Sequence, residues 1–166
     1  MNLLPQDMVD KAREVIEANR RAGRTIVVAE SCTGGLVSAA LTEIAGSSEV
    51  FQAGFVTYSN DMKTRRLKVS QDVLDTFGAV SVATAWAMAQ GALEASDADT
   101  AVAITGIAGP DGGTPSKPVG TVVFARARRE DDVDAVVADS KLFDAGEGRA
   151  GIRRQATLCA LELLMP

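Results

Sequence analysis

The chain has 166 residues, of which 46% are hydrophobic and 23% charged, and this length and composition predict one globular domain over residues 1–166. Its formal net charge of −5 argues against nucleic acid or an anionic membrane as the main partner. The chain contains no histidine, which excludes Ser-His-Asp and Cys-His catalysis and every metal site that needs imidazole. A nucleophile would need Lys, Tyr, Asp or Glu as its base, and a Ser-Lys pair is the recognised alternative.

Helices and strands are expected to alternate through the first half of the chain. Apolar residues at helical spacing predict a helix from about Met8 that ends at Gly23. A β-branched run predicts a buried strand over 25–29, and small apolar residues predict a helix from Leu36 to about Ile44. A second strand over 50–58 and short helices over 62–68 and 72–77 follow.

The second half of the chain is expected to contain consecutive strands without helices between them. Ser81 is predicted to cap a helix over 82–95 that turns Trp86, Ala89 and Leu93 inward. Strands are expected over 100–105, 120–127 and 133–143, and the last helix over about 147–164. Strands that alternate with helices early and lie next to each other late predict an α/β fold with a mixed sheet.

A glycine-rich turn between the first strand and the following helix is the most informative motif. It carries a hydroxyl, a thiol and a second hydroxyl at Ser31, Cys32 and Thr33, followed by Gly34 and Gly35. Three interpretations stay open from the residues alone: a cap for the helix, a cradle for a phosphate, or an exposed nucleophile. No Gly-Lys-Ser/Thr follows, so the turn is not a Walker loop.

A second segment joins the only tyrosine, Tyr58, to a cluster of basic residues that begins at Lys63. One interpretation is a basic helix face exposed to solvent. The other is a desolvated lysine that acts as a general base, with Tyr58 relaying a proton or orienting that lysine.

Two later segments could also carry function. Residues 105–120 are too rich in Gly and Pro for a helix or strand, and they leave the carboxyl end of a predicted strand, where α/β sheets bind ligands. Arg149 and Arg153 share a helix face, where they could hold a phosphate or pair with Glu147 at the surface.

Together these segments resemble the C-terminal domain of the CinA competence/damage-inducible proteins, whose stand-alone members are nicotinamide mononucleotide deamidases. The motifs that carry the resemblance span almost the whole chain: 29–36, 54–60 with Lys63, 78–81, 104–113, 117–122, and Arg149 with Arg153. The resemblance implies a three-layer α/β/α fold with a mixed, mostly parallel sheet of about five or six strands.

The resemblance also implies a reaction, in which the carboxamide of nicotinamide mononucleotide is hydrolysed to nicotinate mononucleotide and ammonia for pyridine nucleotide salvage. No metal and no cofactor is required. Ser31 would be the nucleophile and Lys63 its base, and Tyr58 would assist the proton transfer. Amides at 34–35 or 105–106 would stabilise the oxyanion, and Lys117, Arg149 or Arg153 would hold the phosphate. The expected substrate-binding residues are Thr33, Gly34, Gly35, Asn60, Thr105, Gly106, Lys117, Arg149 and Arg153.

Alternatives of other classes stay open. One is a metal-dependent nucleotide hydrolase that uses Glu30 and Asp111, and another is a non-catalytic nucleotide-binding module linked to competence or DNA damage. Cys32 is the competing nucleophile within the amidase hypothesis. Two scattered cysteines, and the lack of a signal peptide or membrane-length apolar run, predict a cytoplasmic protein, and a homo-oligomer is possible.

Overall fold

The computed structural model describes residues 1–166 and contains one five-stranded sheet. The strands are β1 (Ile26–Glu30), β2 (Phe51–Val56), β3 (Thr100–Gly106), β4 (Thr121–Arg128) and β5 (Val137–Leu142), in the order β2-β1-β3-β4-β5. β1 runs parallel to both β2 and β3, whereas β4 is antiparallel to both of its neighbours. Only β4 therefore opposes the common strand direction, which confirms the mixed, mostly parallel sheet.

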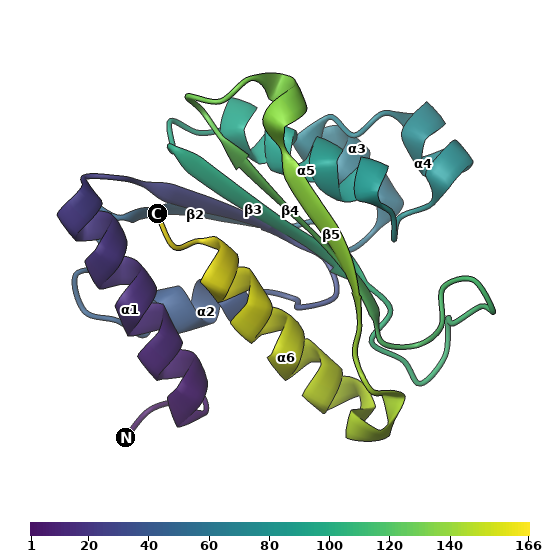
Figure 1. Ribbon diagram of the computed structural model, residues 1–166, viewed down its shortest axis with the longest axis horizontal. Coiled ribbons are helices and arrows are strands. Elements are labelled where there is room, and N and C mark those ends of the chain that lie inside the picture. The colour runs from purple at the N-terminus through teal and green to yellow at the C-terminus, as the bar shows by residue number, and fades with distance from the viewer.

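Six helices form two layers around this sheet (Figure 1). α1 (Gln6–Ala22), α2 (Leu36–Thr42) and α6 (Gly148–Leu163) share one hydrophobic cluster and cover one face. α3 (Asn60–Leu67), α4 (Gln71–Phe77) and α5 (Val82–Glu94) pack on the other face. The three-layer α/β/α architecture is confirmed. No helix is both long and apolar enough to cross a bilayer.

Alternation along the strands explains the two separate cores. In β4, Val122 and Phe124 point into the α1–α2–α6 cluster, whereas Val123 and Ala125 point into the α5 cluster. Successive side chains of a strand face opposite sides of a sheet, so a central strand covered on both faces must be apolar throughout. The first four residues of β1 meet this requirement, and the fifth, Glu30, is a buried exception.

Two predictions differ from the structure. Trp86 is only partly buried, because α5 lies against the sheet through small side chains such as Ala85 and Ala89, and Trp86 lines a surface pocket together with Leu67 of α3. The strand predicted over 133–143 begins only at Val137. The preceding residues, Val133–Ala135, form a 3₁₀ turn closed by the bond from the Ala135 amide to Asp132 O.

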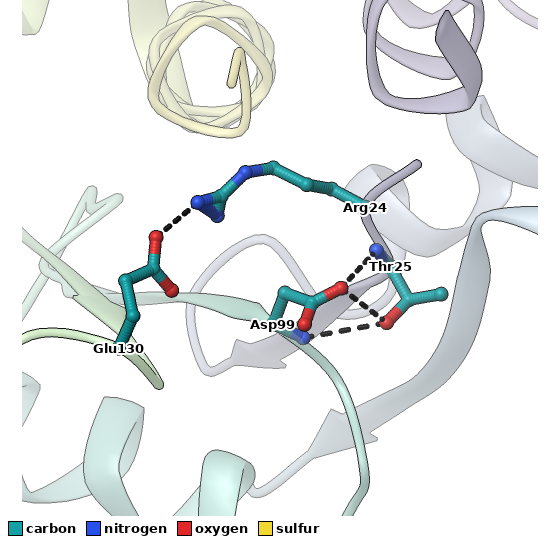
Figure 2. Close-up of polar contacts among 4 residues, drawn as sticks. All are labelled: Arg24, Thr25, Asp99 and Glu130. Atoms are coloured by element: carbon teal, nitrogen blue, oxygen red, sulfur yellow. Dashed lines mark hydrogen bonds and ion pairs between the residues drawn. The ribbon is translucent and has the colours of Figure 1, made fainter. Parts of the chain in front are cut away.

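Polar side chains close the amino end of the sheet (Figure 2). The Asp99 carboxylate accepts hydrogen bonds from the Thr25 amide at 2.8 Å and from its hydroxyl at 3.1 Å. Arg24 reaches across to pair with Glu130 after β4. The connection between α1 and β1 is therefore tied both to the start of β3 and to the end of β4.

Candidate active site

A cavity of about 260 Å³ lies at the opposite, carboxyl end of the parallel strands. Ser31 follows β1, Tyr58 and Lys63 follow β2, and Gly106 ends β3. Parallel strands end at the same edge of a sheet, so the topology brings these three segments together. Arg149 reaches the cavity from the start of α6, and the cavity lining includes Ser31, Tyr58, Lys63, Thr105, Gly106 and Arg149.

The central contact joins Ser31 Oγ to Lys63 Nζ at 2.9 Å. The lysine side chain is 1% exposed, and its Nζ also donates to the carbonyl oxygens of Thr57 at 2.8 Å and Tyr58 at 3.3 Å. Burial disfavours the charged ammonium and lowers the pKa of Lys63 to about 8. A lysine in this state can accept a proton near neutral pH.

Local helix geometry explains why this lysine alone is buried. Ser59 caps α3 by accepting a hydrogen bond from the Met62 amide at 3.2 Å, which fixes where the helix begins. Lys63 and Leu67 are four residues apart and face the interior, whereas Arg65 and Arg66 are exposed. The interpretation of this segment as a wholly solvent-exposed basic face is therefore wrong at Lys63.

Glu30 organises the turn that carries Ser31. Its carboxylate is fully buried and accepts five hydrogen bonds. The donors are Thr33 Oγ1 at 2.7 Å, the amides of Gly35, Val37 and Ser38 at 3.2, 3.0 and 3.1 Å, and Ser38 Oγ at 2.7 Å. A carboxylate next to a helix start satisfies the unpaired amides of the first turn. From the sequence, Glu30 is predicted only as a metal ligand of the alternative hydrolase, although a carboxylate shortly before a predicted helix is itself a signal for a helix cap.

The two glycines of the turn serve its geometry. Gly34 and Gly35 have φ angles of +58° and +99°, a region that side chains with a Cβ rarely occupy. Their amides donate to Ser31 O at 3.0 Å and to Glu30 Oε1 at 3.2 Å. Both amides are therefore engaged inside the turn, which does not fit the expectation that they stabilise an oxyanion.

Cys32 lies beside Ser31 and is also buried. Burial raises the pKa of its thiol to about 11, so the thiol stays protonated at neutral pH. Because the thiolate is the reactive form, this environment disfavours Cys32 as the nucleophile.

Arg149 and Arg153, which both lie on α6, make different contacts. Arg149 donates to Gly109 O at 2.6 Å and to the Tyr58 hydroxyl at 3.1 Å, and it lines the cavity. Arg153 donates instead to the carbonyl oxygens of Cys32 at 3.1 Å and Thr33 at 3.2 Å, in the turn that carries Ser31. The Tyr58 ring is largely exposed, and it is the main-chain carbonyl of Tyr58, not its hydroxyl, that contacts Lys63.

Several expected binding residues lie elsewhere. Asn60 is exposed at the start of α3, and Lys117 donates to Phe77 O at 2.7 Å; neither lines the cavity. The Thr33 hydroxyl is buried and donates to Glu30, so this side chain is directed away from a ligand, whereas Thr105 lines the cavity with its hydroxyl bonded to Ala79 O at 2.8 Å.

Fold and site together define an α/β protein with a buried serine–lysine contact at the carboxyl edge of its parallel strands. The family model of the CinA C-terminal domain matches residues 9–166. The chain therefore belongs to the CinA C-terminal domain family, which confirms the resemblance drawn from its motifs.

Individual relatives agree with this assignment. The chain is 46% identical to the nicotinamide-nucleotide amidohydrolase PncC of Escherichia coli K12, over 95% of this chain and 93% of that protein. It is 49% identical to a putative competence-damage inducible protein of Symbiobacterium thermophilum over 86% of this chain, but it spans only 34% of that longer protein.

Solved structures give the same picture. The crystal structure of the competence/damage inducible protein CihA from Agrobacterium tumefaciens matches with a TM-score of 0.93 and 48% identity, over 99% of this chain and 97% of that one. A CinA superfamily protein from Klebsiella pneumoniae matches with a TM-score of 0.88 and 33% identity, over 96% of each chain.

Proposed function

We propose that this chain hydrolyses the carboxamide of nicotinamide mononucleotide to nicotinate mononucleotide and ammonia, with Ser31 as nucleophile and Lys63 as its base. The observation that carries the proposal is the 2.9 Å contact between Ser31 Oγ and a buried lysine whose pKa is lowered to about 8. The E. coli relative that matches nearly end to end is named for an activity of this kind.

The contacts of Lys63 suit a general base. A neutral amine has two N–H donors and one lone pair, and the carbonyls of Thr57 and Tyr58 can take both donors. The lone pair then faces Ser31 Oγ. These carbonyls hold the amine in place, so no histidine is needed to orient it.

The reaction then proceeds in two halves. Ser31 Oγ bonds to the amide carbon while its proton passes to Lys63, and a tetrahedral oxyanion forms. The C–N bond breaks as Lys63 returns the proton to the leaving nitrogen, which departs as ammonia. Water, deprotonated by Lys63, attacks the resulting ester and releases the carboxylate and the free serine.

The rest of the cavity can hold a nucleotide. The apolar residues Val80, Ile107 and Ala108 suit the pyridine ring, and Arg149 is the cation of the lining that suits the 5′-phosphate. Two contacts occupy only part of the five N–H donors of its guanidinium group, so the others remain for a ligand. By contrast, Glu30 accepts five hydrogen bonds on its two oxygens, which leaves it poorly suited to hold the metal of the alternative hydrolase hypothesis.

Ammonia release from nicotinamide mononucleotide tests the proposal in the wild type, Ser31→Ala and Lys63→Ala. We expect both substitutions to reduce the rate to near background, and Arg66→Ala, which changes an exposed cation on the same helix, to leave it unchanged. A fully active Ser31→Ala variant would refute the mechanism. Binding without ammonia release would favour the regulatory module, and activity abolished by EDTA would favour the metal-dependent alternative.

A further inference from the structure

The guanidinium group of Arg153 donates hydrogen bonds to the main chain of the nucleophile turn, which is the turn over residues 31–35 that carries Ser31. Its Nε donates to Cys32 O at 3.1 Å and its terminal nitrogen to Thr33 O at 3.2 Å. We infer that Arg153 is a positioning residue that, opposite Glu30, holds the amides of Cys32 and Thr33 as the donors of the oxyanion hole. This inference rests on the proposed function, because it concerns the oxyanion of that reaction.

The hydrogen bonds of the turn single out these two amides. The Ser31 amide donates to Ile104 O at 2.9 Å, the Gly34 amide to Ser31 O, and the Gly35 amide to Glu30. The amides of Cys32 and Thr33 donate to no acceptor of another residue, although Cys32 is 5% exposed and Thr33 fully buried. The Cys32 amide lies against its own thiol, and sulfur is only a weak acceptor. Buried amides without an acceptor are rare in native proteins, so an acceptor supplied by a ligand is the simplest account.

The contact of Arg153 fixes how one of these amides points. A trans peptide group is planar, with its C=O and N–H on opposite sides. Because Arg153 holds the carbonyl of Cys32 toward α6, the amide of Thr33 in the same peptide group must point away from α6. The residue after a nucleophile commonly supplies one oxyanion donor, and in this chain that residue is Cys32.

The carboxylate of Glu30 supports the same arrangement from the other side. It accepts hydrogen bonds from the amides of Gly35, Val37 and Ser38, which fixes the end of the turn and the start of α2. The Glu30 carboxylate therefore binds the amides that follow the turn, and the Arg153 guanidinium group binds the carbonyl oxygens within it. Gly34 allows this close approach, since a Cβ there would lie 3.2 Å from the Arg153 guanidinium.

This role for Arg153 competes with the role expected from the sequence, in which it holds the phosphate. The two roles differ in their kinetics. A phosphate ligand acts on the phosphorylated substrate alone and chiefly through KM, whereas a positioning residue for the oxyanion hole acts on kcat for any amide that enters. Arg149 is the matched contrast, because it lines the cavity while Arg153 does not.

The experiment measures kcat and KM of wild type, Arg153→Met and Arg153→Lys for nicotinamide mononucleotide and for its dephosphorylated riboside. A second readout follows the labelling of Ser31 by phenylmethanesulfonyl fluoride by mass spectrometry. In that step the Oγ–S bond forms, fluoride leaves, and the proton passes to Lys63. Arg154→Met, which changes an exposed neighbour that pairs with Asp7, is the control.

We expect Arg153→Met to lower kcat by about 100-fold for both substrates, with KM within about threefold and a similar loss in the labelling rate. The pH midpoint near 8 should stay, because Lys63 is untouched. Arg153→Lys should recover part of the loss, and it decides the question if the Met variant does not fold. Arg154→Met should match the wild type.

Three results would overturn the inference: unchanged kcat and labelling, a loss confined to KM of the phosphorylated substrate, or a loss that follows a shifted pH midpoint. If the wild type releases no ammonia from either compound, the proposed function has failed. The rate of Ser31 labelling then still decides whether Arg153 positions the turn.

Discussion

Charged and hydroxyl side chains lie at both ends of the sheet, but they are paired differently at the two ends. At the amino end, Asp99 accepts from the main chain and side chain of Thr25, and Arg24 pairs with Glu130 (Figure 2). At the carboxyl end, Lys63 is buried against a hydroxyl and two carbonyls, with no carboxylate within ion-pair distance. A buried cation without a counter-ion is costly, and such groups cluster at functional sites, so this contrast supports the proposed role of Lys63.

This difference has an energetic consequence. A fall in the pKa of Lys63 from 10.5 to about 8 corresponds to about 3 kcal/mol that the folded protein loses when this lysine is protonated. The burial of Lys63 therefore lowers the stability of the fold at the carboxyl end of the sheet. Substitutions at the two ends should separate activity from stability.

Lys63→Met should reduce the rate more than the other substitutions that compare the two ends of the sheet. Removal of the general base should lower kcat by about 1,000-fold or more, because Ser31 then has no group to accept its proton. Arg24→Met at the amino end should leave kcat unchanged. Equal losses in the two variants, measured as ammonia release, would contradict the division between the two ends.

Glu30→Gln should have the next largest effect, and on both properties at once. The amide nitrogen of Gln is a donor and would oppose either the Ser38 amide or the donors at the other carboxylate oxygen. We expect a loss of about 3 kcal/mol in the free energy of unfolding, together with reduced activity. Urea denaturation with parallel kinetics measures both, and full activity in a destabilised variant would show that Glu30 does not position Ser31.

The pH dependence of kcat/KM should show a midpoint near 8. Below that pH Lys63 is protonated and cannot act as a base, so the rate should fall about tenfold per pH unit. A rate profile flat from pH 6 to 9 would rule out Lys63 as the base.

The same lysine makes stability depend on pH. The side chain of Lys63 binds fewer protons in the folded than in the unfolded protein between about pH 8 and 10.5, so its contribution to stability rises with pH across that window. Relative to Lys63→Met, the free energy of unfolding of the wild type should therefore rise by about 2 kcal/mol from pH 8 to 10.

The smallest effect concerns the amino end alone. Asp99→Ala removes two hydrogen bonds to Thr25 and should lower the free energy of unfolding by about 2 kcal/mol. The value of kcat should stay within about twofold of wild type, since the sheet separates Asp99 from the cavity. A change in kcat larger than the change in stability would mean that the two ends are coupled.

Much of the fold could be predicted because its signals are local. Gly23 ends α1 in the left-handed conformation, and Ser81 caps α5, as their neighbours in the sequence indicate. The partial burial of Trp86 could not be predicted, because it depends on how closely α5 and α3 approach. A Cβ at Gly91 would lie 1.9 Å from the carbonyl oxygen of Leu67, a contact far away in the sequence.

The candidate site also contains residues that the sequence predicts and contacts that it does not. Ser31 and Lys63 could be named from their motifs, and the structure places them in contact. The contacts of Arg153 with the turn could not be foreseen, because they join residues more than 100 positions apart. Helical spacing alone makes Arg149 and Arg153 equivalent, and only the packing of α6 against the turn that carries Ser31 separates their contacts.

Mass spectrometry of the acid-quenched reaction with nicotinamide mononucleotide tests most directly whether Ser31 is the nucleophile. The mechanism predicts a covalent acyl adduct on Ser31, absent from Ser31→Ala and still present in Cys32→Ala, because burial keeps the Cys32 thiol protonated. An adduct on Cys32, or ammonia released by a Ser31→Ala protein at the wild-type rate, would contradict it.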